Sequence, residues 1–254
     1  MDDVRALMEL SKAIAMSAGE RLLAMAPADV ASYRQSLEYP REIKAAADLV
    51  AEGDILGQLA ATGLPVLSEE SGFRPGREST DLVFIVDPLD GTFNFVKGLG
   101  PSAVSIALWR RRCPVFGVIY DLAERKLVWG GAGLGAYRDA SPIAVSTTTS
   151  ARRASICTGI PVRVDVQDSR NRDSLWKLVG SFAKVRMFGS AAVSLAHVAA
   201  GAADAYSESQ IMIWDVAAGL AIVEGAGGTI QFEFTDPEHA LNVFAGNGRI
   251  SAPG

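Results

Sequence analysis

The feature that most constrains this chain is the stretch VFIVDPLDGTFNF at residues 83–95. Its first four residues, Val83 to Val86, are a continuous apolar run that predicts a buried strand. The proline and glycine of the following segment, residues 87–92, predict a turn. Two carboxylates, Asp87 and Asp90, are therefore expected together at the carboxyl end of a buried strand, just before a segment with free backbone N–H groups.

Two carboxylates this close repel each other, and a cation between them is one way to keep both ionised. Hard cations such as Mg²⁺ prefer oxygen ligands and usually bind one or two carboxylates together with substrate phosphate. The alternative is that Asp87 and Asp90 only cap a turn, where Asp is common. Further acids accompany other motifs: Glu69-Glu70 lies upstream in VLSEESG, and Asp215 lies downstream in WDVAAGLAIVEGAGG.

Three segments resemble signatures of the inositol monophosphatase family. DPLDGTFNF is similar to the family's DPxDGTxNF, WDVAAGLAIVEGAGG to its WDxAAGxxxxxEAGG, and SEESG to its upstream glutamate motif. They occur in the family's order, and the resemblance extends over nearly the whole chain. It implies an α/β (α+β) fold, specifically a layered α/β/α/β/α sandwich. It also implies a Mg²⁺-dependent, lithium-sensitive phosphomonoesterase for small polyol, sugar or nucleotide phosphates.

The resemblance also implies the metal site. Two or three Mg²⁺ ions are expected, with Mn²⁺ possible. The first ion would be held by Glu69, Asp87 and the Leu89 carbonyl, the second by Asp87, Asp90 and Asp215, and a weaker third by Glu69 with waters. Glu70 would lie just outside these ligands.

The catalytic residues implied are Asp48 and Thr92, which would position the attacking water, together with Glu69. The family's threonine three residues after the aspartate is Ala51 here, which removes one hydroxyl. The substrate contacts implied lie in three segments: Gly91, Thr92, Ser190, Ala191 and Glu208. The Gly91 and Thr92 N–H groups would bind phosphate at a helix start, where unpaired donors favour an anion.

Several of these acids also have a purely structural explanation. Asp48 could be an N-cap or first-turn acid favoured by the helix dipole. Asp215 precedes an expected helix and could be its N-cap. Glu208 could be a surface acid at a strand end. We expect Trp214 to pack rather than to stack on substrate.

Composition excludes several classes of function. A formal charge of −5 over 254 residues argues against binding polymeric nucleic acid or a membrane surface, which would need a basic face. The two histidines, His197 and His239, are too few to favour zinc or non-haem iron. Cys113 and Cys157 lack paired spacing and are expected to be small buried thiols in a reducing cytoplasm.

The expected cellular context follows from the same observations. Asp2 and Asp3 with no apolar segment predict no signal peptide, and no apolar run reaches the roughly 18 residues of a membrane span. We therefore expect a cytoplasmic protein whose partner is a small phosphorylated substrate. The family resemblance implies a homodimer.

The remaining sequence predicts helices interleaved with strands in two parts, residues 1–145 and 146–254. The first part is expected to hold an amphipathic helix (4–25), a loop (27–44), a helix (45–61) and an antiparallel meander (103–109, 115–120, 127–129) whose first turn carries a solvated arginine triplet. The second part is expected to hold strands at 154–158, 184–188, 203–207 and 229–234, and helices at 169–182, 191–200 and 217–224, the second of them capped by Gly189-Ser190.

Competing functions remain open at this stage. The alternative to an inositol-type phosphatase is a 3′(2′),5′-bisphosphate nucleotidase of the CysQ-like branch, and Asn94-Phe95 and Asp48 favour the inositol type. Fructose bisphosphate and histidinol phosphate are further possible substrates. A catalytically inactive metal- or phosphate-binding protein would be expected to lack a metal ligand, and all of the implied side-chain ligands are present.

Overall fold

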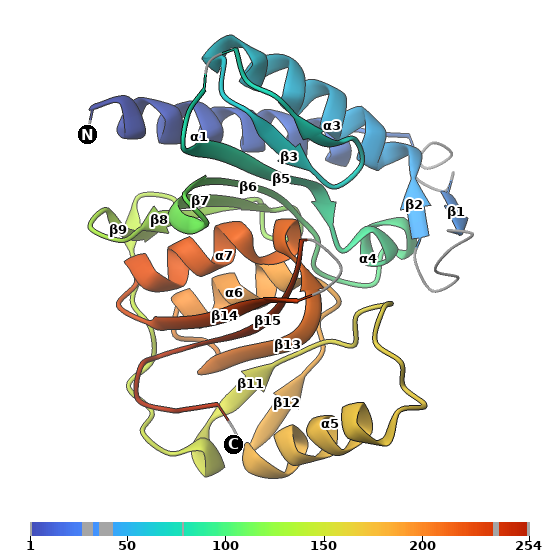
Figure 1. Ribbon diagram of the computed structural model, residues 1–254, viewed down its shortest axis with the longest axis vertical. Helices are drawn as coiled ribbons and strands as arrows, with labels where there is room; N and C mark the ends of the chain where they lie inside the picture. The colour runs from blue at the N-terminus through green and yellow to red at the C-terminus, as the bar shows by residue number, and fades with distance from the viewer. Residues whose placement is uncertain (1, 27–32, 36–42, 78, 236–238, 253–254) are drawn as a thin grey trace.

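The chain folds into five stacked layers (Figure 1). The structure, a computed structural model, describes residues 2–26, 33–35, 43–77, 79–235 and 239–252. Helices α1 (Asp2–Leu23) and α3 (Ala46–Leu59) cover the outer face of a first sheet. Helices α6 (Ala191–Ala199) and α7 (Ile213–Gly225) fill the space between two sheets, and α5 (Ser169–Ser181) lies beyond the second. This confirms the layered α/β/α/β/α sandwich.

The first sheet has eight strands in the order β10-β9-β8-β7-β6-β5-β3-β4. All its neighbours pair antiparallel except β3 and β5, which run parallel. The predicted meander is confirmed as β6 to β8. The strands are β3 (Val66–Ser68), β4 (Gly72–Arg74), β5 (Leu82–Asp90), β6 (Ala103–Arg110), β7 (Cys113–Asp121), β8 (Lys126–Gly131), β9 (Gly135–Arg138) and β10 (Ser141–Pro142).

The second sheet has five strands in the order β12-β11-β13-β15-β14. Strand β11 is parallel to β12 and β13, whereas β13, β15 and β14 pair antiparallel. Strand β15 was not predicted: nearly all its residues are buried, so it shows no apolar–polar alternation. The strands are β11 (Ser155–Cys157), β12 (Lys184–Arg186), β13 (Ala205–Met212), β14 (Thr229–Thr235) and β15 (Ala240–Gly246).

Several predicted boundaries need correction. The loop prediction for 27–44 is wrong where β1 (Tyr33–Gln35) and β2 (Ile43–Ala45) pair antiparallel; residues 27–32 and 36–42 lie outside the described residues. Strand β5 continues past Val86 to Asp90 through an irregularity in its pairing with β6. Helix α7 begins at Ile213 rather than 217, so its WD motif lies inside the helix. Short helices complete the chain: η1 (Ala60–Thr62), α4 (Thr92–Lys97) and η2 (Ala151–Arg153).

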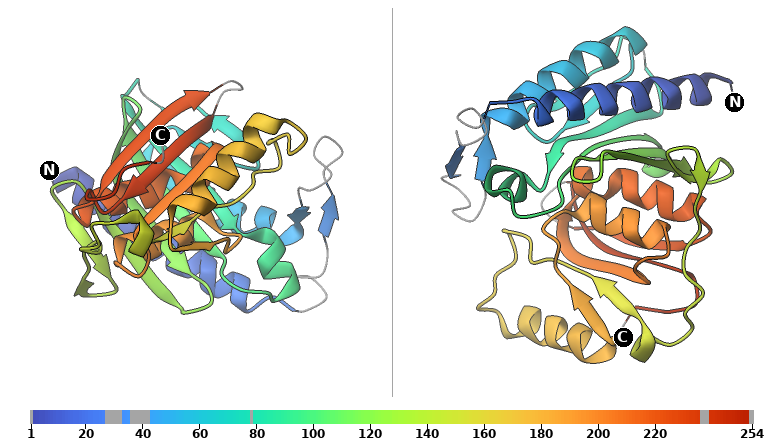
Figure 2. Two further views of the ribbon diagram at one scale, coloured as in Figure 1. Left: turned by 90° about the horizontal axis from the view of Figure 1, so that it is seen from below. Right: turned by 180° about the vertical axis from the view of Figure 1, so that it is seen from behind.

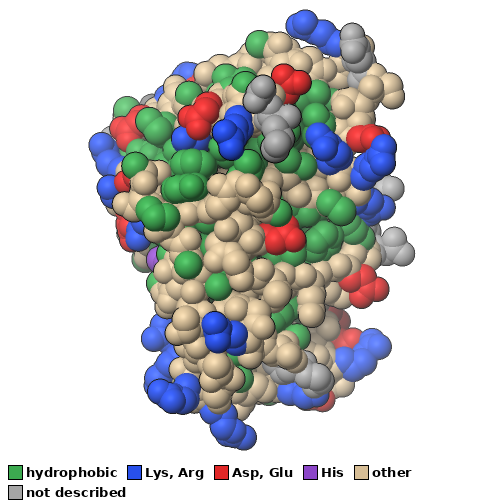
Figure 3. Space-filling view, turned by 90° about the vertical axis from the view of Figure 1, so that its left-hand side faces the viewer, with side chains coloured by type: hydrophobic (Ala, Val, Ile, Leu, Met, Phe, Trp, Pro, Cys, Tyr) green, Lys and Arg blue, Asp and Glu red, His purple; other side chains and the backbone are tan. Residues whose placement is uncertain are grey.

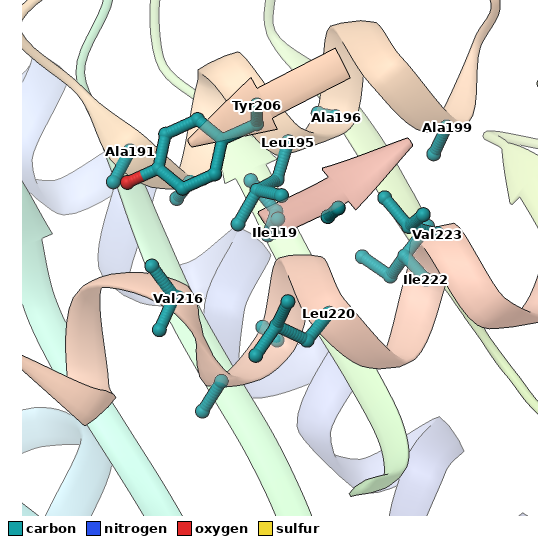
Figure 4. Packing of buried hydrophobic residues seen from close by; sticks show 14 of the residues in the cluster. Ile119, Ala191, Leu195, Ala196, Ala199, Tyr206, Val216, Leu220, Ile222 and Val223 are labelled. Carbon is teal, nitrogen blue, oxygen red and sulfur yellow. The ribbon is translucent and has the colours of Figure 1, made fainter. Parts of the chain in front are cut away.

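Burial explains the different character of the helices. Helix α1 buries one stripe, including Ile14, Ala18 and Leu22, against the first sheet, as its amphipathic pattern predicts. Helices α6 and α7 are apolar on nearly all sides because they lie between sheets (Figure 4). Helix α7 approaches β7 closely: a Cβ at Gly117 would lie 2.0 Å from the Ala218 carbonyl oxygen, so this position excludes larger residues.

Further views confirm the stacking and show one face of the surface. Helix α5 lies on the side of the second sheet away from α6 and α7 (Figure 2). The face in Figure 3 carries acidic and basic side chains together.

Within the described ranges, no helix is both long and apolar enough to cross a bilayer. The division into residues 1–145 and 146–254 stays a prediction.

Candidate active site

Three carboxylates from three elements converge near the carboxyl ends of strands β3 and β5 in the first sheet. Glu69 follows β3, Asp87 lies on β5, and Asp215 lies in the first turn of α7. Each offers one oxygen, and these oxygens all lie within 4.8 Å of one another. Strands β3 and β5 are parallel neighbours, so their carboxyl ends meet. The start of α7 brings in the third acid, which is more than 120 residues away in the sequence.

Burial and mutual repulsion of these three carboxylates favour a bound cation. Burial raises the pKa of each carboxyl well above its usual range, and a neighbouring acid adds to the rise: Asp215 for Glu69, Glu69 for Asp87, and Asp90 for Asp215. Three such acids cannot all be ionised without compensation. An all-oxygen set with the Leu89 carbonyl nearby fits a hard divalent cation, so the residues present suit the implied metal.

Asp90 lies at the same cavity but is bound to helix α6. Its carboxylate accepts hydrogen bonds from the Ser190 hydroxyl, from the Ala192 N–H at 2.8 Å and from the Ala191 N–H at 3.3 Å. Burial raises the pKa of Asp90 to about 6, although these hydrogen bonds oppose the rise. Asp90 is not among the three acids that converge, so its role as a metal ligand stays a prediction.

The hydrogen bonds to Asp90 also account for the start of α6. Ser190 is its N-cap, and the Ser190 hydroxyl accepts from the Val193 N–H at 3.2 Å. The predicted cap is therefore confirmed. Since the same hydroxyl donates to Asp90, Ser190 joins strand β5 to the second half of the chain.

Asp48 and Thr92 form a pair beside the carboxylates. Thr92 Oγ1 lies 2.9 Å from Asp48 Oδ1 and 3.0 Å from the Leu89 carbonyl oxygen. Asp48 Oδ2 accepts from the Ala45 N–H at 2.6 Å, so the first-turn explanation of Asp48 is correct, and its catalytic role stays a prediction. Burial raises the pKa of Asp48 to about 6. Ala51 is buried in the core above the first sheet.

Gly91 makes the tight passage from β5 into α4. Its φ of +82° lies in the left-handed region, and a Cβ there would meet the carbonyl oxygens of Pro101 at 3.0 Å and of Gly189 at 3.1 Å. Glycine is therefore required both by the left-handed backbone conformation and by the lack of space for a side chain. Gly91 is the N-cap of α4, as the predicted helix start requires, and phosphate binding by its N–H stays a prediction.

Most of the predicted site residues line one cavity of about 240 Å³. Asp48 and Glu70 are the two that do not line it. The ten that do lie in or directly beside β3, β5, α4, α6, β13 and α7: Glu69, Asp87, Leu89, Asp90, Gly91, Thr92, Ser190, Ala191, Glu208 and Asp215.

Glu208 is only 9% exposed, which contradicts its interpretation as a surface acid. It lies inside β13 rather than at a strand end. Burial raises the pKa of this carboxyl to about 8. Such a group is expected to have a ligand or a structural partner, because an unpaired buried carboxylate is costly.

The structure also tests the structural expectations for Asp215, Trp214 and the two cysteines. The N-cap of α7 is Met212, and Asp215 is its third residue, so the N-cap explanation of Asp215 is wrong. Trp214 is partly buried and packs against the central core, as expected. The expectation of two buried thiols is wrong for Cys113, which is exposed, and correct for Cys157.

The sequence did not indicate part of the cavity wall. The segment Thr158 to Pro161, together with Ser194 and Ile211, also lines it. Thr158 directly follows β11, and the sequence carries only the general signal that strand ends gather polar residues. The order of strands in the second sheet, which brings β11 beside β13, could not be read from local pattern.

Comparison with known proteins gives the family. The sequence profile described as Inositol monophosphatase family matches residues 3–249. This chain belongs to the inositol monophosphatase family. As a member, it is a hydrolase of a metal-dependent phosphomonoesterase family.

Individual relatives agree over most of the chain. It is 33% identical to an inositol-1-monophosphatase of Synechocystis sp., over 98% of this chain and 87% of the relative. It is 35% identical to the Nus factor SuhB of Escherichia coli, over 73% of this chain and 70% of that relative. The solved structure of the extragenic suppressor protein suhB from Bartonella henselae superposes with a TM-score of 0.84 at 34% identity, over 96% of this chain and 95% of that one.

Proposed function

We propose that this protein hydrolyses a small phosphate monoester of the inositol monophosphate type with the help of Mg²⁺. The observation that supports this most is the meeting of Glu69, Asp87 and Asp215 within 4.8 Å, in a cavity that also contains Thr92. Family membership and the inositol-1-monophosphatase relative support the same reaction class. Two or three Mg²⁺ ions, or Mn²⁺, would be held by Glu69, Asp87, the Leu89 carbonyl, Asp90 and Asp215, with Glu70 nearby.

The reaction adds water to the phosphorus atom. A new P–O bond forms to the water oxygen, the ester P–O bond breaks, and the alcohol leaves with a proton that derives from water. When bound, Mg²⁺ would neutralise charge on the phosphoryl oxygens and lower the pKa of water. The three acids fix where that charge is placed.

Thr92 and Asp48 would orient the water. A hydroxyl has one proton, so Thr92 donates to either Asp48 or the Leu89 carbonyl. If it donates to Asp48, its lone pairs are free to accept from water, and the Leu89 carbonyl is free for a cation. The buried carboxylate of Asp48 thereby sets the direction in which the threonine can act.

The substrate would be held on two sides. The N–H groups of Gly91 and Thr92 would receive the phosphate at the start of α4, next to Ser190 and Ala191 of α6. Glu208 would accept hydrogen bonds from hydroxyls of the leaving alcohol, since a polyol binds well only when its hydroxyls are paired. The alternative of a 3′(2′),5′-bisphosphate nucleotidase or another sugar phosphatase uses the same carboxylates with a different alcohol.

The cellular context belongs to the proposal as well. We expect the protein to act in the cytoplasm as a homodimer on a small phosphorylated substrate, without binding polymeric nucleic acid or membranes. Lithium is expected to inhibit it. An inactive metal- or phosphate-binding protein is the remote alternative.

The test is phosphate release in Mg²⁺ buffer, with and without EDTA, from inositol 1-phosphate, 3′-phosphoadenosine 5′-phosphate, fructose 1,6-bisphosphate and histidinol phosphate. We expect release that EDTA stops, with inositol 1-phosphate the best substrate. A different best substrate would assign the protein to another of the alternative phosphatase types, such as the bisphosphate nucleotidases. No release from any compound would contradict the proposal and favour the inactive binding protein.

A further inference from the structure

Glu52 is a buried acid outside the residues assigned to metal and substrate. It lies on helix α3 and is 6% exposed. It is not one of the three acids whose oxygens converge, and it does not line the cavity beside them. A buried carboxylate is costly unless hydrogen bonds replace those it made to water. The partners of Glu52 therefore indicate what this side chain does.

One oxygen of Glu52 holds two serines that lie on either side of Glu69. Glu52 Oε1 accepts from the Ser68 hydroxyl, from the Ser71 N–H at 3.0 Å and from the Ser71 hydroxyl at 3.0 Å. Ser68 ends strand β3 and directly precedes Glu69, and Ser71 follows two residues after it. The carboxylate of Glu52 thus fixes the chain before and after Glu69 from a single point.

The same turn is held from strand β5 as well. The Glu69 N–H donates to the Val86 carbonyl at 3.2 Å. The Ser71 hydroxyl oxygen accepts from Arg74 Nε at 3.1 Å, which leaves its one proton to be donated to Glu52. The backbone that carries the Glu69 carboxylate is therefore held by a helix on one side and by a strand on the other.

Helix α3 places Glu52 on the same face as Asp48. The two residues are four positions apart, which puts them one turn apart on the helix, and both are buried. Asp48 contacts Thr92 at the start of α4, whereas Glu52 contacts the turn after β3. One face of α3 thus keeps the proposed water-positioning pair and the turn that carries Glu69 in a fixed relation.

We propose that Glu52 is a positioning residue for the metal site, because it keeps Glu69 where it can bind a cation. Glu52 itself touches neither the cation nor the substrate. The inference rests on the proposed Mg²⁺-dependent function and adds a residue to it. Removing a partner that orients metal ligands typically weakens metal binding by roughly 10- to 100-fold. The simpler alternative is that Glu52 only pairs the buried hydroxyl of Ser68, in which case its loss lowers stability and leaves metal affinity unchanged.

Calorimetric titration of Mg²⁺ into the intact protein separates these two roles. The Kd of the tightest site is measured for the wild type, Glu52→Ala and Glu52→Gln, and the melting temperature of each is measured in EDTA. Glu52→Gln keeps an oxygen that accepts hydrogen bonds and removes the charge. Asp54→Ala is the matched control, since it removes another acid of α3, one that pairs with Arg21. We expect a Kd about tenfold higher in Glu52→Ala, and a Kd close to the wild-type value in Glu52→Gln and Asp54→Ala.

The results that would overturn the inference are distinct. An unchanged Kd in Glu52→Ala with a lower melting temperature would make its role purely structural. An equal rise of the Kd in Glu52→Ala and Glu52→Gln would make the charge, rather than the hydrogen bonds, the cause. A wild type that binds no Mg²⁺ would overturn the inference together with the metal site. If the wild type binds Mg²⁺ but releases no phosphate from any ester of the panel, the proposed function fails, and the Kd values still decide the role of Glu52.

A second variant keeps the test decisive if Glu52→Ala does not fold. Ser71 is exposed, and Ser71→Ala removes only the hydroxyl bond to Glu52 and the acceptor for Arg74. We expect a higher Mg²⁺ Kd in Ser71→Ala than in Asp54→Ala. Equal Kd values in these two variants would overturn the positioning role.

Discussion

Thr92 Oγ1 lies 2.9 Å from Asp48 Oδ1 and connects the starts of helices α4 and α3 across 44 residues of sequence. The pair borders the acids that converge at the sheet edge. Asp48 is held from its other oxygen by the Ala45 N–H, so its direction is fixed by the backbone. The proposed positioning of the attacking water depends on this contact.

Removing the threonine hydroxyl should therefore cost activity rather than stability. We expect Thr92→Val to lower kcat by at least about 100-fold, the lower end of what positioned proton-transfer groups contribute, with KM and the melting temperature little changed. Thr92→Ser keeps the hydroxyl and is the control that should retain most activity. Equal loss in both variants would assign the effect to packing.

Removing one charge from the three converging acids should stabilise the metal-free protein but reduce the stabilisation that Mg²⁺ provides. Because the three acids repel one another, Asp215→Asn should raise the melting temperature of the EDTA-treated protein. Mg²⁺ at a hundred times its Kd should stabilise the wild type by about 2.7 kcal/mol, and this gain should shrink or vanish in the variant. Differential scanning calorimetry measures both, with Asp173→Asn on α5 as the control. A wild-type melting temperature indifferent to Mg²⁺ would contradict the metal site.

Much of this site was predictable because its residues lie in short, dense motifs. The run before Asp87 predicted the strand, but the turn predicted at residues 87–92 is wrong for residues 87–90, which continue β5, and the chain changes direction only at Gly91. The contact of Asp90 with the start of α6 was not predictable, since Ser190 lies 100 residues away and only the stacking of the two sheets brings it near. The helical position of Asp215 was missed because Ile213 and Trp214 read equally well as the end of a strand.

The Ser190 cap gives a prediction about stability. Ser190→Ala removes an N-cap, worth about 1 kcal/mol, and a hydrogen bond to a buried carboxylate, worth roughly 1.5 to 3 kcal/mol. We expect urea denaturation to show a loss of about 2 to 4 kcal/mol. Ser194→Ala in the same helix removes only a bond to the Ser190 carbonyl and should cost less than about 1 kcal/mol. Similar losses in the two variants would argue against the role of the cap.

Asp204 predicts a pH dependence of stability. Burial acts to raise the pKa of this carboxyl, but hydrogen bonds from Ser146 and Ser155, among others, outweigh burial and leave the pKa below its usual range. A lowered pKa in the folded state stabilises the protein above the unfolded pKa of about 3.9, and this stabilisation is lost as pH falls through the folded value. Asp204→Asn should thus be less stable than wild type at pH 7, with the difference narrowing below about pH 4. A difference that is constant with pH would contradict this.

The two cysteines should differ in reactivity. Cys113 is exposed, whereas burial raises the pKa of the Cys157 thiol to about 12 and leaves it without the thiolate that reacts. Iodoacetamide at pH 8 should add one group to the native protein and two after unfolding in guanidinium, as measured by intact mass. Two groups on the native protein would show that the second half of the chain opens readily.

The most direct test of the central claim is the rate of phosphate release over a series of Mg²⁺ concentrations, for wild type and Asp87→Asn, with the best substrate of the panel. Asp87 is buried, and one of its carboxylate oxygens lies within 4.8 Å of oxygens of Glu69 and Asp215. We predict that the wild-type rate rises with Mg²⁺ and saturates, and that Asp87→Asn stays at background while its circular dichroism is unchanged. A variant with the wild-type rate and the same Mg²⁺ dependence would contradict a metal-assisted reaction at these carboxylates.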